Sequence, residues 1–114
     1  GNPKTFSEII LAYLKTSEVD ENQICEKCGF EKSFISKLKN DKNYHPSKET
    51  IILLALSLEL SEEELDNLLE SASYSLPKNN IYDLIIRFCF INKIYRIIDV
   101  NELLDEYDCD LFNY

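Results

Sequence analysis

Apolar and polar residues alternate along the chain with the spacing of amphipathic helices. Apolar side chains recur three and four positions apart after Thr5, after Asp20 and after Ser61. Each of these residues is followed three positions later by Glu or Gln, which is the pattern of a capping box that satisfies the first free amides of a helix. The pattern therefore predicts helices over residues 5–16, 20–28 and 61–72.

Two further helices are predicted between these segments and at least one after them. Phe34, Ile35 and Leu38 predict a short helix over 31–39, and Pro46 followed by Ser47 begins another that extends over 48–60. The stretch 81–91 is strongly apolar, and residues 100–104 indicate a last, acidic helix. The β-branched stretch 94–98 also fits a short extended segment, so its structure stays open at this point.

The predicted helix 48–60 has almost no polar face. A helix that is apolar all round is buried all round, so another segment must cover the side that the other predicted helices leave open. The apolar stretch 81–91 is the candidate for that role. We therefore expect one domain over 1–114, with a core over 5–72 and a C-terminal helical extension over 79–112 packed on it.

Composition makes an enzyme the weakest of the function classes. The 114 residues include only two glycines and one histidine, so a glycine-rich phosphate loop or a histidine-rich metal site is not expected. No catalytic residues, cofactor or metal are predicted. The absence of a long apolar run and of a signal sequence predicts a cytoplasmic chain without membrane contact. Methionine is absent even at position 1, which predicts that the chain belongs to a longer gene product with a further domain.

Four cysteines and the single histidine are candidates for chemistry. Cys25 and Cys28 have zinc-site spacing, but no second pair matches it, so we expect both in the core. Cys89 lies in an apolar run and is also expected in the core, whereas Cys109 is expected to be exposed and unpaired. His45 is interpreted as a solvated loop residue, with phosphate or partner contact as the alternative.

The segment Asp20–Asn40, DENQICEKCGFEKSFISKLKN, resembles the helix-turn-helix of the Cro and lambda repressor-like family. The resemblance continues through PSKET at 46–50 and LALSLELSEEEL at 54–65, and covers roughly residues 5–72. It implies an all-α fold with a five-helix repressor-like core, here followed by about two C-terminal helices. Gly29 takes the place of the turn glycine, where a positive φ is needed. The pattern after residue 72 is similar to C-terminal helix-turn-helix domains of longer bacterial proteins, for instance those behind macro-type domains.

The resemblance implies that the helix from Glu31 to Lys39 lies in a major groove of double-stranded DNA. Residues 27–48 carry a net charge of +4 in a chain whose formal net charge is −9, which fits a cationic patch on an anionic body. The implied DNA-binding residues fall into three groups. Base edges would be contacted by Lys32, Ser33, Phe34 and Ser36, backbone phosphates by Lys37 and Lys39, and Lys42 would lie beside them.

Three departures from the family pattern support an alternative. Glu21 stands where many relatives carry a phosphate-binding glutamine, Glu31 stands at the usual cap of the recognition helix, and Phe34 replaces a small polar residue facing the groove. The leading hypothesis is a DNA-binding transcriptional regulator or targeting module of a larger bacterial protein. The alternative is a protein-interaction module that keeps this shape and binds a partner through an exposed Phe34 or the acidic C-terminal helix. A second copy of the chain is a further candidate partner.

Overall fold

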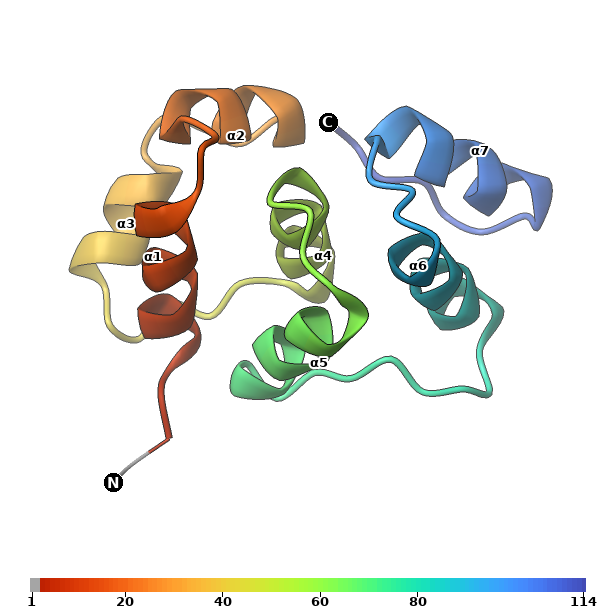
Figure 1. Ribbon diagram of the computed structural model, residues 1–114, viewed down its shortest axis with the longest axis horizontal. Coiled ribbons are helices and arrows are strands. Elements are labelled where there is room, and N and C mark those ends of the chain that lie inside the picture. Colours follow the sequence, from red (N-terminus) through yellow and green to blue (C-terminus); the bar gives the residue numbers. More distant parts are fainter. Residues whose placement is uncertain (1–2) are drawn as a thin grey trace.

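The computed structural model describes residues 3–114, which form seven α-helices and contain no strand (Figure 1). The all-α prediction is therefore confirmed for these residues. None of the helices within 3–114 is long and apolar enough to cross a membrane. The helices are α1 (Phe6–Thr16), α2 (Glu21–Cys28), α3 (Phe34–Asn40), α4 (Lys48–Ser57), α5 (Glu62–Ser71), α6 (Ile81–Ile91) and α7 (Ile97–Glu106).

The predicted helix starts are confirmed where a capping box marks them. Thr5, Asp20 and Ser61 are the N-cap residues of α1, α2 and α5, and both hydrogen bonds of each box are present. Ser47 caps α4 by accepting from the amide of Thr50. A cap is a contact between near neighbours in sequence, so it can be read from the chain without knowing the tertiary structure.

Two predicted boundaries are wrong. The helix predicted over 48–60 ends at Ser57, because Glu59 adopts a left-handed φ of 53° that turns the chain toward α5. The helix predicted over 31–39 begins only at Phe34. The structure decides the stretch 94–98, which the sequence left open: residues 94–96 have no regular structure, and Ile97 and Ile98 belong to α7.

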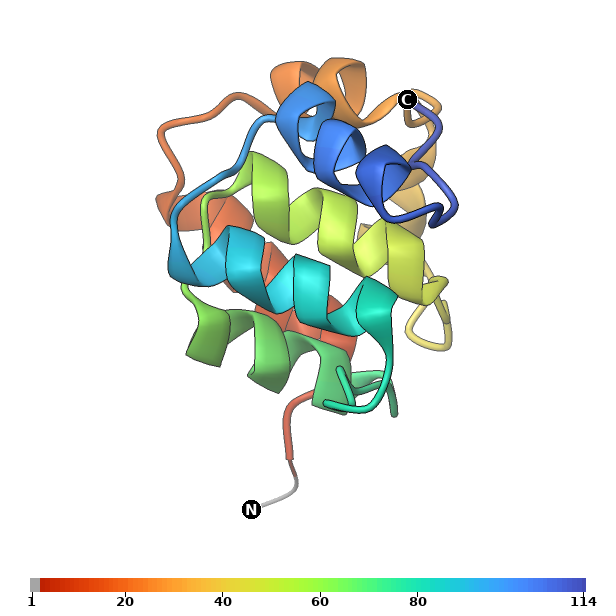
Figure 2. The ribbon, with the colours of Figure 1, turned by 90° about the vertical axis from the view of Figure 1, so that its right-hand side faces the viewer.

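α4 lies at the centre of the molecule. All its residues from Ile51 to Ser57 are buried, which confirms the expectation from its missing polar face. α2 and α5 pack against α4, and α1 packs against α3 and α5. α6 lies beside α4 and α5 and contacts α7 (Figure 2). One cluster of buried side chains runs from Phe6 to Phe112, so the C-terminal helices share the core of the first five.

Two ion-paired clusters attach α6 to the first five helices. Asp83 is 3% exposed and its Oδ1 accepts a 2.6 Å hydrogen bond from Nζ of Lys48 on α4. Arg87 donates to Glu62 and Asp66 on α5 and also to the carbonyl oxygen of Leu76. The hydrogen bonds to two carboxylates hold the pKa of Arg87 above its ordinary value. Both clusters orient α6, which therefore presents a fixed side to solvent.

The C-terminal segment returns from α7 to the turn between α2 and α3. Asn101 fixes it by accepting from the amide of Phe112 at 2.9 Å and donating to its carbonyl at 3.0 Å, and the Phe112 side chain is buried. Gly29 has φ 70°, which confirms the positive φ expected at this turn. A Cβ at Gly29 would also lie 2.8 Å from the backbone of Tyr114, so this turn has no room for a side chain.

Candidate nucleic-acid interface

α3 lies at one end of the molecule, and α6 and α7 lie at the other end (Figure 1). The longest extent of the molecule is 39 Å, so the two ends are well separated. α3 is held by its inner side, where Phe34, Ile35 and Leu38 are buried. The C-terminal helices do not cover its outer side, which is free to meet a macromolecule.

The outer side of α3 is a row of polar side chains, which we call the α3 face. It consists of Ser33, Ser36, Lys37 and Asn40, all exposed and spaced three, four and seven positions after the first. Residues at this spacing lie on one side of a helix. Asn40 donates from Nδ2 to Oγ of Ser36 at 3.2 Å, so these two side chains are oriented together. Three of the four are short and uncharged, which allows a close approach of the helix backbone to a surface.

Phe34 does not belong to this face, so its interpretation as an exposed residue was wrong. Its side chain is only 7% exposed and its ring centroid lies 4.4 Å from that of Phe30 and 6.0 Å from that of Tyr44. Phe34 is the first residue of α3 and lies four positions before the buried Leu38, so its ring is on the inner side of the helix, against Phe30 in the turn and Tyr44 in the following loop. Phe34 is therefore a core residue and offers no surface for a thymine methyl or a protein partner.

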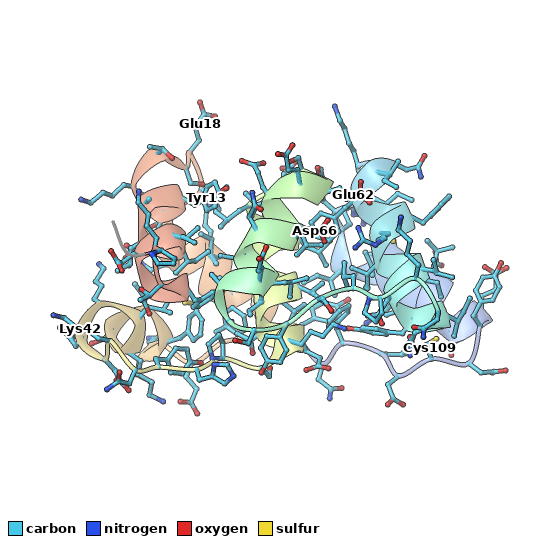
Figure 3. The ribbon with its side chains drawn as sticks, turned by 90° about the horizontal axis from the view of Figure 1, so that it is seen from below. Tyr13, Glu18, Lys42, Glu62, Asp66 and Cys109 are labelled. Atoms are coloured by element: carbon cyan, nitrogen blue, oxygen red, sulfur yellow. The ribbon has the colours of Figure 1, made fainter. Side chains whose placement is uncertain are left out.

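Three lysines surround the α3 face. Lys32 precedes the helix, Lys39 lies near its end and Lys42 follows in the loop, and all three are exposed. Figure 3 shows Lys42 at this end of the molecule. Its positive charge acts on Glu8, whose pKa is lowered mainly by hydrogen bonds from Thr5 and additionally by Lys4 and Lys42. Together with Lys37, these side chains provide cations along and beside the face.

Carboxylates lie among these cations. Glu21 at the start of α2 pairs with Lys39 at 3.2 Å, and both side chains are about half exposed. Glu31 accepts a long 3.5 Å hydrogen bond from the hydroxyl of Ser33, which leaves α3 without a side-chain N-cap. The pair between Lys39 and Glu21 is of the surface kind that contributes little to stability and exchanges readily with other partners.

The structure separates two lysines from this group, although the sequence places all of them in the same basic segment. Lys48 is the cation of the buried pair with Asp83, and its ammonium also lies 5.9 Å from the ring centroid of Tyr82. Lys27 lines a cavity with residues of α7 and with Tyr114. The net charge of +4 over 27–48 is therefore not gathered on one surface.

The cysteines take up packing positions. Cys25, Cys28 and Cys89 are buried, as predicted, while Cys109 is half-buried rather than exposed. Cys28 donates weakly to the carbonyl of Leu53 at 3.4 Å, and burial raises the pKa of both Cys28 and Cys89 to about 11. Within residues 3–114, no three His, Cys, Asp or Glu side chains come together as metal ligands would. His45 is exposed and stacks on Tyr74 with centroids 5.4 Å apart.

Asn40 is the member of the α3 face that the sequence did not single out. Its spacing of four residues from Ser36 and seven from Ser33 would place it on the same side of a helix, but the predicted helix ended at residue 39 and so did not include it. Lys32 lies before the helix rather than on it.

Comparison with protein-family models, curated proteins and solved structures gives no significant match to this chain. The function must therefore be inferred from its own residues.

Proposed function

We propose that the chain binds double-stranded DNA, with α2 and α3 acting as a helix-turn-helix and α3 lying in the major groove. It would serve as a transcriptional regulator or as the targeting module of a larger protein. The α3 face carries this proposal: a helix held only by its inner side presents Ser33, Ser36, Lys37 and Asn40 at the free end of the molecule. The major groove of B-DNA admits an α-helix of this kind.

The chemistry of the α3 face suits base edges. An asparagine amide both donates and accepts, so Asn40 matches adenine, and the ammonium of Lys37 matches the two acceptors of guanine. The hydroxyls of Ser33 and Ser36 suit either kind of edge. Lys32, Lys39 and Lys42 lie beside the helix and are placed to contact phosphates, which would fix its register.

Binding in this way requires one rearrangement. Lys39 must leave Glu21 to reach a phosphate, and Glu21 would then lie near the backbone as an unfavourable negative charge. The exposure of both partners makes the exchange feasible. Glu31 adds a second carboxylate on this side, so we expect moderate affinity with a clear dependence on salt.

Fluorescence anisotropy of a labelled mixed-sequence duplex, titrated at several salt concentrations, tests the proposal. The three lysines placed to neutralise phosphates, Lys32, Lys39 and Lys42, correspond to a log–log slope of roughly −2.7. The variant Lys37→Ala with Lys39→Ala should weaken binding through the loss of one base contact and one phosphate contact, and bring the slope closer to zero by roughly 1. The matched control is Lys78→Ala with Lys93→Ala, which removes the same charge beside α6 at the other end of the molecule.

An unchanged slope in the first variant, or an equal change in the control, would reject the α3 face as the binding surface. Complete absence of binding at low salt would favour the protein-interaction module instead.

A further inference from the structure

The solvent side of α6 is apolar along its whole length. Ile81, Leu84, Phe88 and Ile91 are 49%, 42%, 50% and 60% exposed, although all four are large apolar residues. Their successive spacings of three, four and three residues place them on one side of the helix, as in the seam of a coiled coil. We call these four residues the α6 stripe.

The α6 stripe is not a side of the helix that the core uses. The core contacts of α6 come from Ile85, Ile86, Cys89 and Phe90, which are 0–7% exposed. A soluble surface rarely keeps several large apolar side chains together in solvent, and a patch of this kind marks an interaction site. The helix therefore has two apolar sides with different roles, one inside the fold and one available to a partner.

The helices on either side of α6 are acidic, while Lys78, Lys93 and Arg96 lie in the segments at its two ends. α6 lies between α5 and α7 (Figure 2), and within their bounds neither helix has a basic residue. The one cation on α6, Arg87, is already held by Glu62 and Asp66 on α5, at 3.1 Å each; Figure 3 labels both carboxylates beside α6. Of the carboxylates on α5, Glu64 interacts with Tyr13 on α1, which leaves Glu62, Glu63, Asp66 and Glu70. α7 carries Glu102, Asp105 and Glu106, and its Asp99 pairs with Arg96.

We propose that the α6 stripe docks a basic amphipathic helix of a partner protein. Apolar residues of that helix would cover the stripe, and its Lys or Arg residues would meet the carboxylates of α5 and α7. A second copy of this chain fits less well, because it would bring its own acidic α5 and α7 against those of the first and place like charges face to face. The proposal does not depend on DNA binding, since α3 lies at the other end of the molecule.

The first test uses the full chain and two labelled synthetic helical peptides. One has Leu at heptad positions a and d and Lys elsewhere, and the other has Glu in place of every Lys. We expect the Lys peptide to bind with an affinity that falls as salt increases, and the Glu peptide to bind at least about tenfold more weakly. Equal binding of both peptides, or no binding of the Lys peptide, would overturn the proposal.

The second test separates docking on the stripe from attraction by charge alone. Phe88→Asp adds a negative charge in the stripe, and Ile98→Asp adds the same charge at a similarly exposed apolar residue, 53% against 50%, that lines the cavity beside Lys27. If the peptide docks on the stripe, its affinity should fall by about tenfold or more for Phe88→Asp and should not fall for Ile98→Asp. Equal behaviour of the two variants would show that only charge attracts the peptide.

The third test concerns the second copy. Sedimentation of the unliganded chain should give a monomer, and the duplex-binding slope should be the same for Phe88→Asp and the parent chain. A dimer that Phe88→Asp dissociates would replace the proposed partner with a second copy of the chain and overturn the proposal.

Discussion

The helices at the two ends of the molecule are alike on the side that faces the core and differ in chemistry on the side that faces solvent. α3 and α6 both bury apolar side chains on their inner side, yet α3 presents Ser33, Ser36, Lys37 and Asn40 outward whereas α6 presents the four apolar residues of its stripe. The inner sides account for the fold, because they join one core. The outer sides are not needed for that core, and their contrast fits the two partners proposed above, one polar and anionic and one apolar with basic flanks.

The ends also differ in how their charges are held. At the α3 end, Lys39 and Glu21 form an exposed pair, while at the α6 end Lys48 and Asp83 form a pair that is largely buried. An exposed pair can exchange partners at little expense, and a buried pair cannot. The first is suited to a surface that binds a ligand, and the second fixes one helix against another.

The largest expected effect concerns two buried thiols, one on α2 and one on α6. Cys28 on α2 and Cys89 on α6 are 1% and 0% exposed, and burial raises the pKa of each to about 11, so neither supplies a thiolate in the folded state. Alkylation at neutral pH followed by mass spectrometry should modify Cys109 first. Cys28 and Cys89 should react roughly a thousandfold more slowly or slower still, at the rate set by unfolding.

The comparison of the two buried thiols tests the expected single domain. Equal rates for Cys28 and Cys89 would mean that the first five helices and the C-terminal extension unfold together. Faster labelling of Cys89 than of Cys28 would show that the C-terminal extension opens on its own, contrary to that expectation.

A second prediction concerns the two ion pairs. Lys48→Ala leaves the Asp83 carboxylate, 5% exposed, without its cation, so the free energy of unfolding should fall by about 3 kcal/mol in denaturant titrations. Lys39→Ala, which breaks the exposed pair at the α3 end, should change it by about 0.5 kcal/mol or less. Lys48→Met combined with Asp83→Leu should recover most of the loss, since no unpaired charge is then buried. Similar losses for the two single variants would contradict the contrast between the ends.

These pairs also show why part of the site could not be predicted from the sequence. The helix starts at Thr5, Asp20 and Ser61 depend on residues three positions apart and were predicted correctly. The partner of Lys48 is 35 residues away, so counting charges along the chain placed this lysine on the wrong surface. A charge can be assigned to a surface only after the fold has determined its neighbours.

Phe34 and α6 show two different limits of the sequence analysis. Phe34 lies four positions before Leu38, so periodicity placed both on the buried side of α3, and its expected exposure came from the family resemblance instead. The neighbours of its ring, Phe30 and Tyr44, are brought together only by the turn and the loop. In α6 both sides of the helix are apolar, and the sequence alone does not reveal which of them is buried. The apolar residues of the stripe can be seen in the sequence, but from the sequence alone they cannot be distinguished from core residues.

A third prediction concerns Gly29, where the C-terminal segment from the α6 end reaches the turn before α3. Gly29→Ala should reduce the free energy of unfolding by about 1–2 kcal/mol, because φ is 70° and the new Cβ would lie 2.8 Å from the Tyr114 backbone. Ser73→Gly is the matched control at another left-handed residue, with φ 65°, and it should leave stability unchanged or slightly raised. Thermal melting of both variants checks this. Equal melting of Gly29→Ala and the parent chain would mean that this turn tolerates a side chain.

The smallest expected effects come from two isosteric substitutions that remove one carboxylate at each end. Glu21→Gln frees Lys39, 3.2 Å away, and removes a negative charge near the phosphates, so duplex affinity should rise roughly threefold at low salt. Glu102→Gln removes the same charge from α7 and should leave duplex affinity unchanged while weakening the Lys peptide about twofold. The affinity of each variant for the labelled duplex and for the labelled Lys peptide is measured by fluorescence anisotropy. If each end has its own partner, Glu21→Gln should change only the affinity for the duplex and Glu102→Gln only the affinity for the peptide. If either variant changed both affinities alike, net charge rather than position would govern binding, and the distinction between the two ends would fail.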